Sequence, residues 1–507
     1  MGRAARARPG GTRLRDIDRL LETTKIAHNR LVWNRILDLP PGSDGPADKA
    51  AAPDHDAALK RLIQLPDAAF RAAGAEDCAA EAQRARLLAG LRFKTVLKAD
   101  PALRDSMAAA RRILSGARFD LAGARVDHGG LLEAVTTHPD KAVRDAAQGH
   151  RRTLEARLHP LAQGIADRRN ALARAGGFAD FPAWTAAQNG LGLRVSATLL
   201  HGIDRATAAT VRAYIDGLEP AGGRAGTADL YFALETAPRL GLRAAPARAQ
   251  LRADLIAPAF QRMCRVLGFG DKPARIRVRT VDLPINGLTV LVAPPEQIFV
   301  ISAPFDSFRC WRVMFHEFGH ALSALFNDQP GYAFKWQDAP CFQEAMAQLI
   351  NHFALDRDSL TALFGSAPAA FRHDQWMIDL CRLRMWLASA RAEAQLYGGG
   401  DRADAAAALP ETGESFDSVY TIFYPFHFQN MVLGDLLARV LKADAPDRPA
   451  DWWIARFYAP GSSVVWRRRV LHALGQPADG PPETTLAALL TARIPTLFTP
   501  PTTPRKA

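Results

Sequence analysis

The sequence predicts a mainly α-helical protein that contains one small β-sheet. Apolar residues recur at three- and four-residue spacing through most of the chain, as in LHPLAQGIADRRNALARAGG at 158–177, which is the periodicity of a helix with one buried face. The segment 274–304 is instead rich in Val, Ile and Thr and is interrupted by Asn286-Gly287 and Pro294-Pro295, which predicts three short strands. No strand–helix alternation or Gly-x-Gly-x-x-Gly motif indicates an α/β nucleotide-binding fold.

The helical pattern runs from about residue 55 to residue 215, and Gly176-Gly177 predicts a helix end within it. A Gly-rich stretch, EPAGGRAGTAD at 219–229, follows. A further helix ends near Gly268, ahead of the strands. Helical periodicity then returns and continues almost to the C-terminus, with a long apolar helix at 376–397.

Composition excludes several classes of protein. Of the 507 residues, 48% are hydrophobic, so the chain can build a large packed core and is neither disordered nor collagen-like. No apolar stretch is long enough to span a membrane, and no apolar signal core follows the basic N-terminus. The five cysteines are scattered and form no Cys-x-x-Cys pair. We therefore expect a cytoplasmic protein with neither a disulfide framework nor membrane attachment.

The net charge of +12 is compatible with a protein that binds nucleic acid. The arginines are spread along the whole sequence, and the only dense basic cluster lies between Arg3 and Arg15, beside Pro and Gly residues. This pattern indicates a compositional bias with a basic tail. We therefore expect no nucleic-acid partner.

The most specific motif is His316-Glu317-Phe318-Gly319-His320. On a helix, His316 and His320 lie one turn apart on the same face, where both imidazoles can bind one zinc ion. Glu317 projects beside them and can take a proton from a metal-activated water. The flanking residues are apolar, so this helix is expected to be buried. Buried imidazole and carboxylate groups need a partner such as a metal ion.

Glu344 is the expected third ligand. Twenty-three residues separate it from His320, which is enough for the first helix to end, for a turn at 328–331, and for a second helix to return antiparallel. Two histidines and one carboxylate leave a position open for water and substrate, as in catalytic zinc sites. Asp338 is a competing ligand, but it precedes Pro340 and is expected in the loop.

The segment 316–345, HEFGHALSALFNDQPGYAFKWQDAPCFQEA, resembles the zinc site of the angiotensin-converting enzyme (peptidyl-dipeptidase A) family. PGSSVVWRRRVLHALG at 460–475 resembles the C-terminal pattern of the same family. RRNALARAGGFADFPAW at 168–184 and FYPFHFQNMVLGDLLA at 423–438 resemble segments of the related thimet oligopeptidase and oligoendopeptidase F family. The chain is thus similar to zinc metallopeptidases of the gluzincin type over roughly 160–475.

The resemblance implies two helical half-lobes that flank a deep substrate cleft, with one Zn²⁺ bound at its floor by His316, His320 and Glu344. The implied substrates are short, unstructured peptides, with Glu317 as general base. We accordingly divide the chain into three parts. Residues 1–54 form a basic tail, a first helix and a linker. Residues 55–495 form one helical peptidase unit, with a metal-binding core at about 274–355 and a cleft wall at about 410–440. Residues 496–507 form a second tail.

The chain also departs from its relatives. Gln348 stands where the converting enzymes have an Asp, and we expect its amide to accept a hydrogen bond from a metal-bound imidazole instead. Phe423 and Phe426 align with tyrosines that stabilise the oxyanion in the relatives, and Phe has no hydrogen to donate.

Tyr420, Tyr424 and His427 are the candidate replacements for these oxyanion donors. Tyr424 and His427 lie three residues apart, so they share a helix face if this segment is helical. Simple helix packing is the alternative explanation for each of them.

The expected function is therefore zinc-dependent hydrolysis of peptide bonds in oligopeptides. The strands near 286–292 and 298–302 could bind an extended peptide by adding a strand at the sheet edge. One alternative is a zinc carboxypeptidase or peptidyl-dipeptidase, although the converting enzymes' binding residues for a substrate C-terminus are not found at the matching positions. Another is a zinc-bearing peptide-binding protein with poor turnover. The oligomeric state is not predicted.

Overall fold

The structure is a computed structural model that describes residues 9–37, 54–74, 78–217, 229–232, 252–281, 287–304, 308–366, 369–398, 418–476 and 482–498. Parts of the sequence predictions lie outside these residues. They are the first eight residues of the basic tail, nearly all of the linker at 39–54, the start of the cleft wall at 410–417 and most of the C-terminal tail.

The N-terminal part of the chain is helical apart from one short hairpin. Its helices are α1 (Pro9–Ile36), α2 (His55–Gln64), α3 (Asp67–Gly74), α4 (Ala79–Ala99), α5 (Pro101–Gly116), α6 (His128–Thr137), α7 (Lys141–Ala175), α8 (Phe181–Asn189) and α9 (Leu193–Asp216). The hairpin strands are β1 (Phe119–Leu121) and β2 (Ala124–Val126).

The C-terminal part contains the second sheet and the central helices. Its strands are β3 (Arg277–Thr280), β4 (Leu288–Ala293) and β5 (Gln297–Ser302). Its helices are α11 (Ile256–Val266), α12 (Phe308–Leu325), α13 (Tyr332–Trp336), α14 (Pro340–Phe353), α15 (Arg357–Phe364), α16 (Ala369–Gly398), α18 (Ser418–Phe423), α19 (His427–Asp444), α20 (Ala450–Trp453), α21 (Trp466–Ala473) and α22 (Pro482–Leu497). Short 3₁₀ turns occur at Ala253–Leu255, Lys272–Arg275 and Gly461–Ser463, and a π turn at Ile454–Tyr458.

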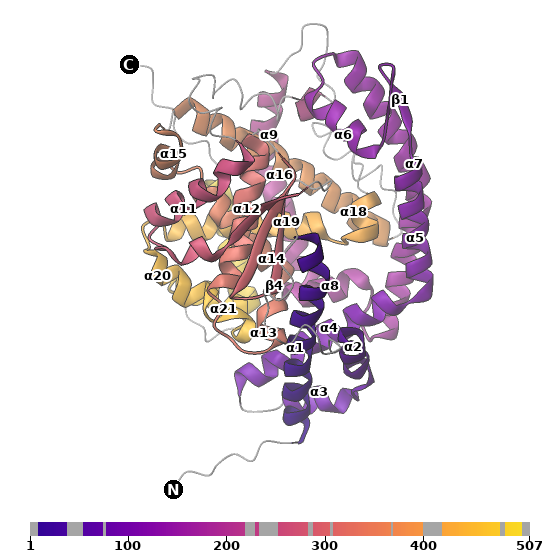
Figure 1. The fold of residues 1–507 in the computed structure, drawn as a ribbon, viewed down its shortest axis with the longest axis vertical. Helices are drawn as coiled ribbons and strands as arrows, with labels where there is room; N and C mark the ends of the chain where they lie inside the picture. Colours follow the sequence, from indigo (N-terminus) through magenta and orange to yellow (C-terminus); the bar gives the residue numbers. More distant parts are fainter. Residues whose placement is uncertain are drawn as a thin grey trace.

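The two parts lie on opposite sides of a central group of helices (Figure 1). Helices α2 to α8 lie to the right and below in this view, most of the C-terminal helices lie to the left, and α12, α14, α16 and α19 occupy the middle. This arrangement confirms the predicted mainly helical fold. No helix of the described residues has the length and apolar character needed to cross a membrane.

The predicted three-stranded sheet is present, with the strand order β3-β5-β4. Strand β4 pairs antiparallel with β5 and is an edge strand, whereas β3 pairs parallel with β5 from the other side. The expectation of a single sheet was wrong, because β1 and β2 form a second one within the segment read as helical. Ala122 and Gly123 both have positive φ values in the turn between them, which is the geometry of a tight two-residue hairpin.

Aspartates begin many of the helices. The side chains of Asp100, Asp127 and Asp180 each accept a hydrogen bond from a backbone N–H in the first turn of the helix that follows. Such caps satisfy donors that otherwise have no partner, and each contributes about 1 kcal/mol of stability. The predicted helix end at Gly176 is also confirmed, because α7 stops at Ala175.

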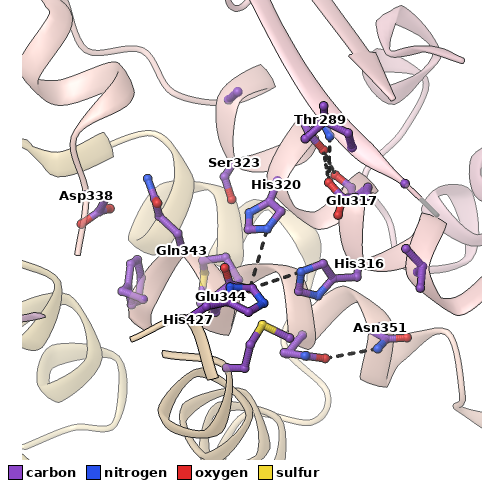
Figure 2. Close-up of a pocket in the computed structure, with 18 of the residues that line it drawn as sticks. Thr289, His316, Glu317, His320, Ser323, Asp338, Gln343, Glu344, Asn351 and His427 are labelled. Atoms are coloured by element: carbon purple, nitrogen blue, oxygen red, sulfur yellow. Dashed lines mark hydrogen bonds and ion pairs between the residues drawn. The ribbon is translucent and has the colours of Figure 1, made fainter. Parts of the chain in front are cut away.

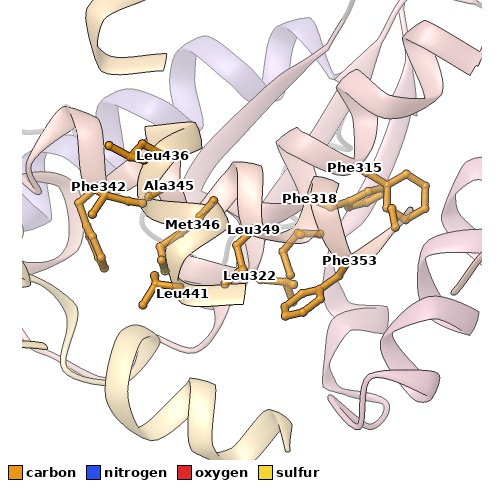
Figure 3. Close-up of a cluster of buried hydrophobic side chains, with 14 of the residues drawn as sticks. Phe315, Phe318, Leu322, Phe342, Ala345, Met346, Leu349, Phe353, Leu436 and Leu441 are labelled. Carbon is orange, nitrogen blue, oxygen red and sulfur yellow. The ribbon is translucent and has the colours of Figure 1, made fainter. Parts of the chain in front are cut away.

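The largest core joins α12, α14 and α19 (Figure 3). This core contains Phe315, Phe318 and Leu322 from α12 and Ala345 and Leu349 from α14. Leu436 and Leu441 come from α19. Burial of such side chains contributes roughly 1.5–3 kcal/mol each.

Two glycines set the spacing of these central helices. A Cβ atom built on Gly319 of α12 would lie 2.5 Å from the Cα of Ala347 on α14, and one built on Gly434 of α19 would lie 2.6 Å from the Cβ of Glu344. The three backbones can approach this closely only because both positions lack a side chain. The helices that carry the motif histidines and Glu344 are therefore held in direct backbone contact.

Candidate metal centre

Helix α12 presents His316 and His320 side by side. They are one helical turn apart, and their ring centroids lie 4.9 Å from each other with the ring planes at 89°. The side chains of His316 and His320 are 13% and 26% exposed. The imidazoles are thus held by a buried helix while their tips remain accessible to a cation and to water.

Glu344, the fifth residue of α14, faces both imidazoles (Figure 2). Its Oε2 atom lies 3.2 Å from Nε2 of His316 and 3.9 Å from Nε2 of His320. Burial acts to raise the pKa of Glu344, but the hydrogen bond and charge of His316 and the charge of His320 outweigh it and lower the pKa to about 2. Glu344 is therefore an anion at neutral pH.

These three side chains fit a divalent cation. Within the described residues they are the one group of three or more His, Cys, Asp or Glu side chains whose ligand atoms all lie close together, within 4.8 Å of one another. The Glu344 Oε2 atom is buried between the two imidazoles, and a cation bound there would offset the cost of burying the carboxylate. Two imidazole nitrogens and one carboxylate oxygen form a donor set suited to zinc.

Glu317 follows His316 on α12, and its carboxylate points toward the edge strand β4. Its Oε2 atom accepts a hydrogen bond from the backbone N–H of Thr289 at 2.8 Å, and the Thr289 hydroxyl lies 2.9 Å from the same oxygen. That hydroxyl also lies 2.7 Å from the Glu317 carbonyl oxygen. Gly287 allows this close approach, because a Cβ there would lie 3.1 Å from Cγ of Glu317. Strand β4 thus fixes the carboxylate beside the histidines.

A cavity of about 800 Å³ opens in front of these residues. Its wall includes Gly287, the β4 residues Leu288, Thr289 and Leu291, the faces of α12 and α14 with the candidate metal-site residues, and the start of α19. A cavity of this size is in the range of ligand-binding sites. The candidate metal centre therefore lies on the wall of a space that can hold several residues of a peptide.

The structure brings His427 and Tyr420 to this cavity but not Tyr424. His427, at the first position of α19, lies beside Glu344 in Figure 2. Burial is the main cause of the lowered pKa of its imidazole. The Tyr420 ring stacks on His427 with centroids 5.4 Å apart, and both residues line the cavity. Tyr424 is 62% exposed and is not part of the cavity wall.

Phe423 and Phe426, at the expected tyrosine positions, both pack in a hydrophobic core. Phe426 is 1% exposed within the core formed by α5, α7, α8 and α18, and its backbone N–H donates to Oε2 of Glu393. Phe423 packs at the edge of the same core, with the Arg111 guanidinium 5.2 Å from its ring centroid. Neither ring lines the cavity described above.

The expectation for Gln348 was wrong. Its Oε1 atom accepts a hydrogen bond from Nδ2 of Asn351, whose Oδ1 accepts in turn from Nε of Arg312. Arg312 also pairs with the buried Asp379. The amide oxygen is thus used by a polar chain beneath the site, because a buried guanidinium and its partners need complete hydrogen bonding. No contact with either motif imidazole is found.

Asp338, the competing ligand, also lies on the cavity wall. Its Oδ2 atom accepts from Nη2 of Arg469 at 2.9 Å, and its Oδ1 atom accepts from the backbone N–H of Ala339 at 2.8 Å. The carboxylate is therefore already paired at the end of the loop before α14.

Sequence reasoning missed Thr289, which carries no motif. Threonine is an ordinary strand residue, and only the pairing of β4 beside α12 reveals its contact with Glu317. The strand prediction itself was the one available signal.

No family model matches the chain, and no curated protein matches it. Several solved structures are similar to the chain. An M32 carboxypeptidase from Deinococcus radiodurans R1 is 13% identical, with a TM-score of 0.57, over 97% of this chain and 100% of that one. A Bacillus anthracis protein described as an oligoendopeptidase F is 13% identical, with a TM-score of 0.55, over 95% of this chain and 85% of that one. A Pyrococcus furiosus carboxypeptidase is 12% identical, with a TM-score of 0.51, over 97% and 100%.

At these identities the likeness concerns the fold. It covers 95% and 97% of this chain in the Bacillus anthracis and Deinococcus radiodurans comparisons. It agrees with the fold that the resemblance to oligoendopeptidase F implies, while the resemblance to the converting enzymes stays an interpretation of the motifs. The chain has the fold of these helical peptidases.

Proposed function

We propose that this protein is a zinc-dependent peptidase that hydrolyses peptide bonds in short, unstructured oligopeptides. His316, His320 and Glu344 would hold the ion, and Glu317 would act as general base. The single observation that carries the proposal is the convergence of Oε2 of Glu344 and the Nε2 atoms of His316 and His320 on the wall of a cavity. A purely structural ion pair would not need two histidines and an open approach.

The chemistry that a divalent cation supplies at such a site is polarisation of a peptide carbonyl and acidification of a water molecule. The protein's own residues would do the rest. Glu317, oriented by Thr289, takes a proton from the attacking water and later delivers it to the nitrogen of the leaving amine. His427 donates a hydrogen bond to the oxygen on which negative charge develops, with Tyr420 stacked behind it.

The test uses a mixed library of short peptides and mass spectrometry of the products. Zinc-loaded wild-type protein should cleave members of the library, a chelator should abolish cleavage, and added zinc should restore it. Glu317→Gln should bind zinc with normal stoichiometry but lose activity by about 10²–10⁴-fold, which is the usual contribution of a general base. Equal activity of this variant and the wild type would overturn the mechanism.

Carboxypeptidase activity is the second candidate. It is favoured by the likeness to the Deinococcus radiodurans and Pyrococcus furiosus carboxypeptidases, which extends over the full length of those chains. Amidating the C-terminus of a cleaved peptide separates the two functions. A carboxypeptidase should lose most of its activity on the amide, whereas an enzyme that does not bind the free C-terminus should not.

A peptide-binding protein with poor turnover is the candidate from outside the enzymes. Phe423 and Phe426 motivate it, because neither can donate a hydrogen bond. It predicts saturable peptide binding by the zinc-loaded protein with no products after long incubation. Products that depend on Glu317 would exclude it.

A further inference from the structure

We propose that Asn29 of helix α1 closes one end of the substrate-binding edge of strand β4, so that a peptide can place only about two residues on the N-terminal side of the cleaved bond. This inference rests on the proposed peptidase function and adds the residue that limits substrate length.

Strand β4 is the edge on which a peptide would pair. The main-chain N–H and C=O groups of successive strand residues point alternately toward and away from the neighbouring strand. Those of Thr289 and Leu291 point away from β5. The Thr289 N–H donates to Glu317, and the Leu291 carbonyl accepts from Asn29. Main-chain groups on such an edge bind an added strand, and a peptide carbonyl that paired with the Thr289 N–H would take the place of the Glu317 carboxylate there. Thr289 lies nearest the catalytic Glu317, so the cleaved bond would lie opposite it.

Asn29 already occupies the next pairing position. Its Nδ2 atom donates to the carbonyl oxygen of Leu291 at 2.6 Å, where the N–H of an added strand would lie. The residue is 3% exposed, so no peptide can share this position with it. Along β4 the cavity wall reaches Leu291, while the following Val292 and Ala293 are buried. The open edge therefore ends at Leu291.

Helix α1 is fastened on both sides of Asn29, so the amide cannot simply swing away. Toward the N-terminus, Glu22 accepts from the backbone N–H of Gly331 at 3.0 Å and pairs with Lys335 at 2.6 Å. Toward the C-terminus, Trp33 and Leu37 pack on Val290, Val292, Phe299 and Ile301 of the sheet. Figure 1 shows α1 running alongside the strands. Asn29, which would block the peptide, is therefore part of a helix that is held in place on both sides.

The distance along the strand sets the length limit. Leu291 lies two positions after Thr289, with only Val290 between them, and a strand rises about 3.3 Å per residue, so roughly two substrate residues reach from the cleaved bond to Asn29. Antiparallel pairing is the commoner arrangement. It directs the N-terminal side of the peptide toward Leu291. The C-terminal side then extends toward Gly287, where the cavity continues.

The test uses two peptide series built around one cleaved sequence. One series is lengthened at the N-terminus and the other at the C-terminus, and kcat/KM is measured with the zinc-loaded full chain. In the wild type, each peptide with more than about two residues before the cleaved bond should be cut about tenfold or more slowly, because it must break the Asn29 hydrogen bond and displace packed atoms. The C-terminal series should show no such step.

Three variants separate the causes. Asn29→Ala should remove most of the decrease in kcat/KM that N-terminal lengthening of the peptide causes. Asn29→Ser serves the same purpose if the alanine variant does not fold. Asn29→Leu should keep the step, because it retains the bulk without the hydrogen bond. Thr23→Ala, at an exposed position of α1, should behave as wild type.

The outcomes distinguish failure of the Asn29 inference from failure of the proposed peptidase function. A wild type that cleaves both series with no N-terminal step, or variants of Asn29 that keep the step unchanged, would overturn the role of Asn29 while leaving the peptidase intact. No cleavage of any peptide by zinc-loaded wild type would instead remove the proposed function, and this inference with it.

Discussion

Thr289 holds the Glu317 carboxylate through both its backbone N–H and its side chain, at 2.8 Å and 2.9 Å from the same oxygen. The contact joins the edge strand to the helix that carries the metal motif. A carboxylate fixed in this way loses little freedom when it accepts a proton from water, and its free oxygen is directed by the bound one.

Replacing Thr289 by Val should therefore reduce peptide cleavage. The variant keeps the backbone hydrogen bond but removes the hydroxyl, and a hydrogen bond to a charged group contributes about 1.5–3 kcal/mol. We expect kcat to fall about 10- to 100-fold with unchanged zinc content, measured by steady-state kinetics and metal analysis. Thr289→Ser retains the hydroxyl and should stay close to wild type. Equal loss in both variants would contradict a specific role of the hydroxyl, because Thr289→Ser keeps that group.

The second prediction is that a side chain at Gly319 would force α12 and α14 apart. Gly319→Ala places a Cβ 2.5 Å from the Cα of Ala347, where only backbone movement can relieve the clash. We expect the free energy of unfolding to fall by about 1–3 kcal/mol. Zinc affinity should also fall, because His320 and Glu344 would move apart. Denaturant unfolding of the metal-free protein and a competition titration with a zinc chelator measure the two effects.

Gly164 provides the matched control for that substitution. It is an exposed helical glycine of α7, and a Cβ there meets nothing within 4 Å. Gly164→Ala should stabilise the protein by about 0.4–1 kcal/mol and leave zinc binding unchanged. A loss of stability in both variants would show that the backbone contact at Ala347 is not the cause.

The clustering of the candidate metal ligands was predictable from the sequence because their spacing is local. His316, Glu317 and His320 lie within one helical turn, and the loop length brings Glu344 back to them on an antiparallel helix. Three strands were also predictable, from the Val, Ile and Thr pattern around Thr289. Their order was not, because the parallel pairing of β3 with β5 depends on contacts that no local pattern encodes.

The remaining features of the site depend on contacts between distant segments. Asn29 and Leu291 are 262 positions apart, and neither belongs to a motif. Gln348 was misassigned because its position relative to the family motif suggested a ring partner, while Asn351, on the same helix, competes for its oxygen. The hairpin at 119–126 was missed because three-residue strands are too short to interrupt a helical pattern.

His427 should contribute to the rate and not to metal binding. His427→Phe removes the donor that lies beside Glu344, and loss of one oxyanion donor typically reduces kcat by about 10²–10³-fold. The variant should bind zinc as the wild type does. Tyr424→Phe is the control, because Tyr424 is 62% exposed and lies outside the cavity wall. A variant of His427 with full activity would assign the donor role elsewhere, with Tyr420→Phe as the next measurement.

The last prediction concerns pH and the attachment of helix α1. His55, on α2, is buried, and its Nδ1 atom lies 2.8 Å from the Thr24 hydroxyl of α1. Burial, followed by the positive charges of Lys25 and His28, lowers the pKa of His55 to about 4. An unfolded chain has a histidine pKa near 6.5. Between pH 6.5 and pH 4 the unfolded chain therefore binds a proton that the folded chain does not.

Stability must then fall as the pH is lowered through that window, because the free energy of unfolding rises with pH wherever the unfolded state holds more protons. We expect a loss of about 1–2 kcal/mol from this residue between pH 6.5 and pH 4. His55→Gln should flatten that part of the stability profile, measured by denaturant unfolding at several pH values. His201→Gln, at an exposed position of α9, should leave the slope unchanged. If both variants keep the wild-type slope, the acid sensitivity arises from other groups and not from the junction between α1 and α2.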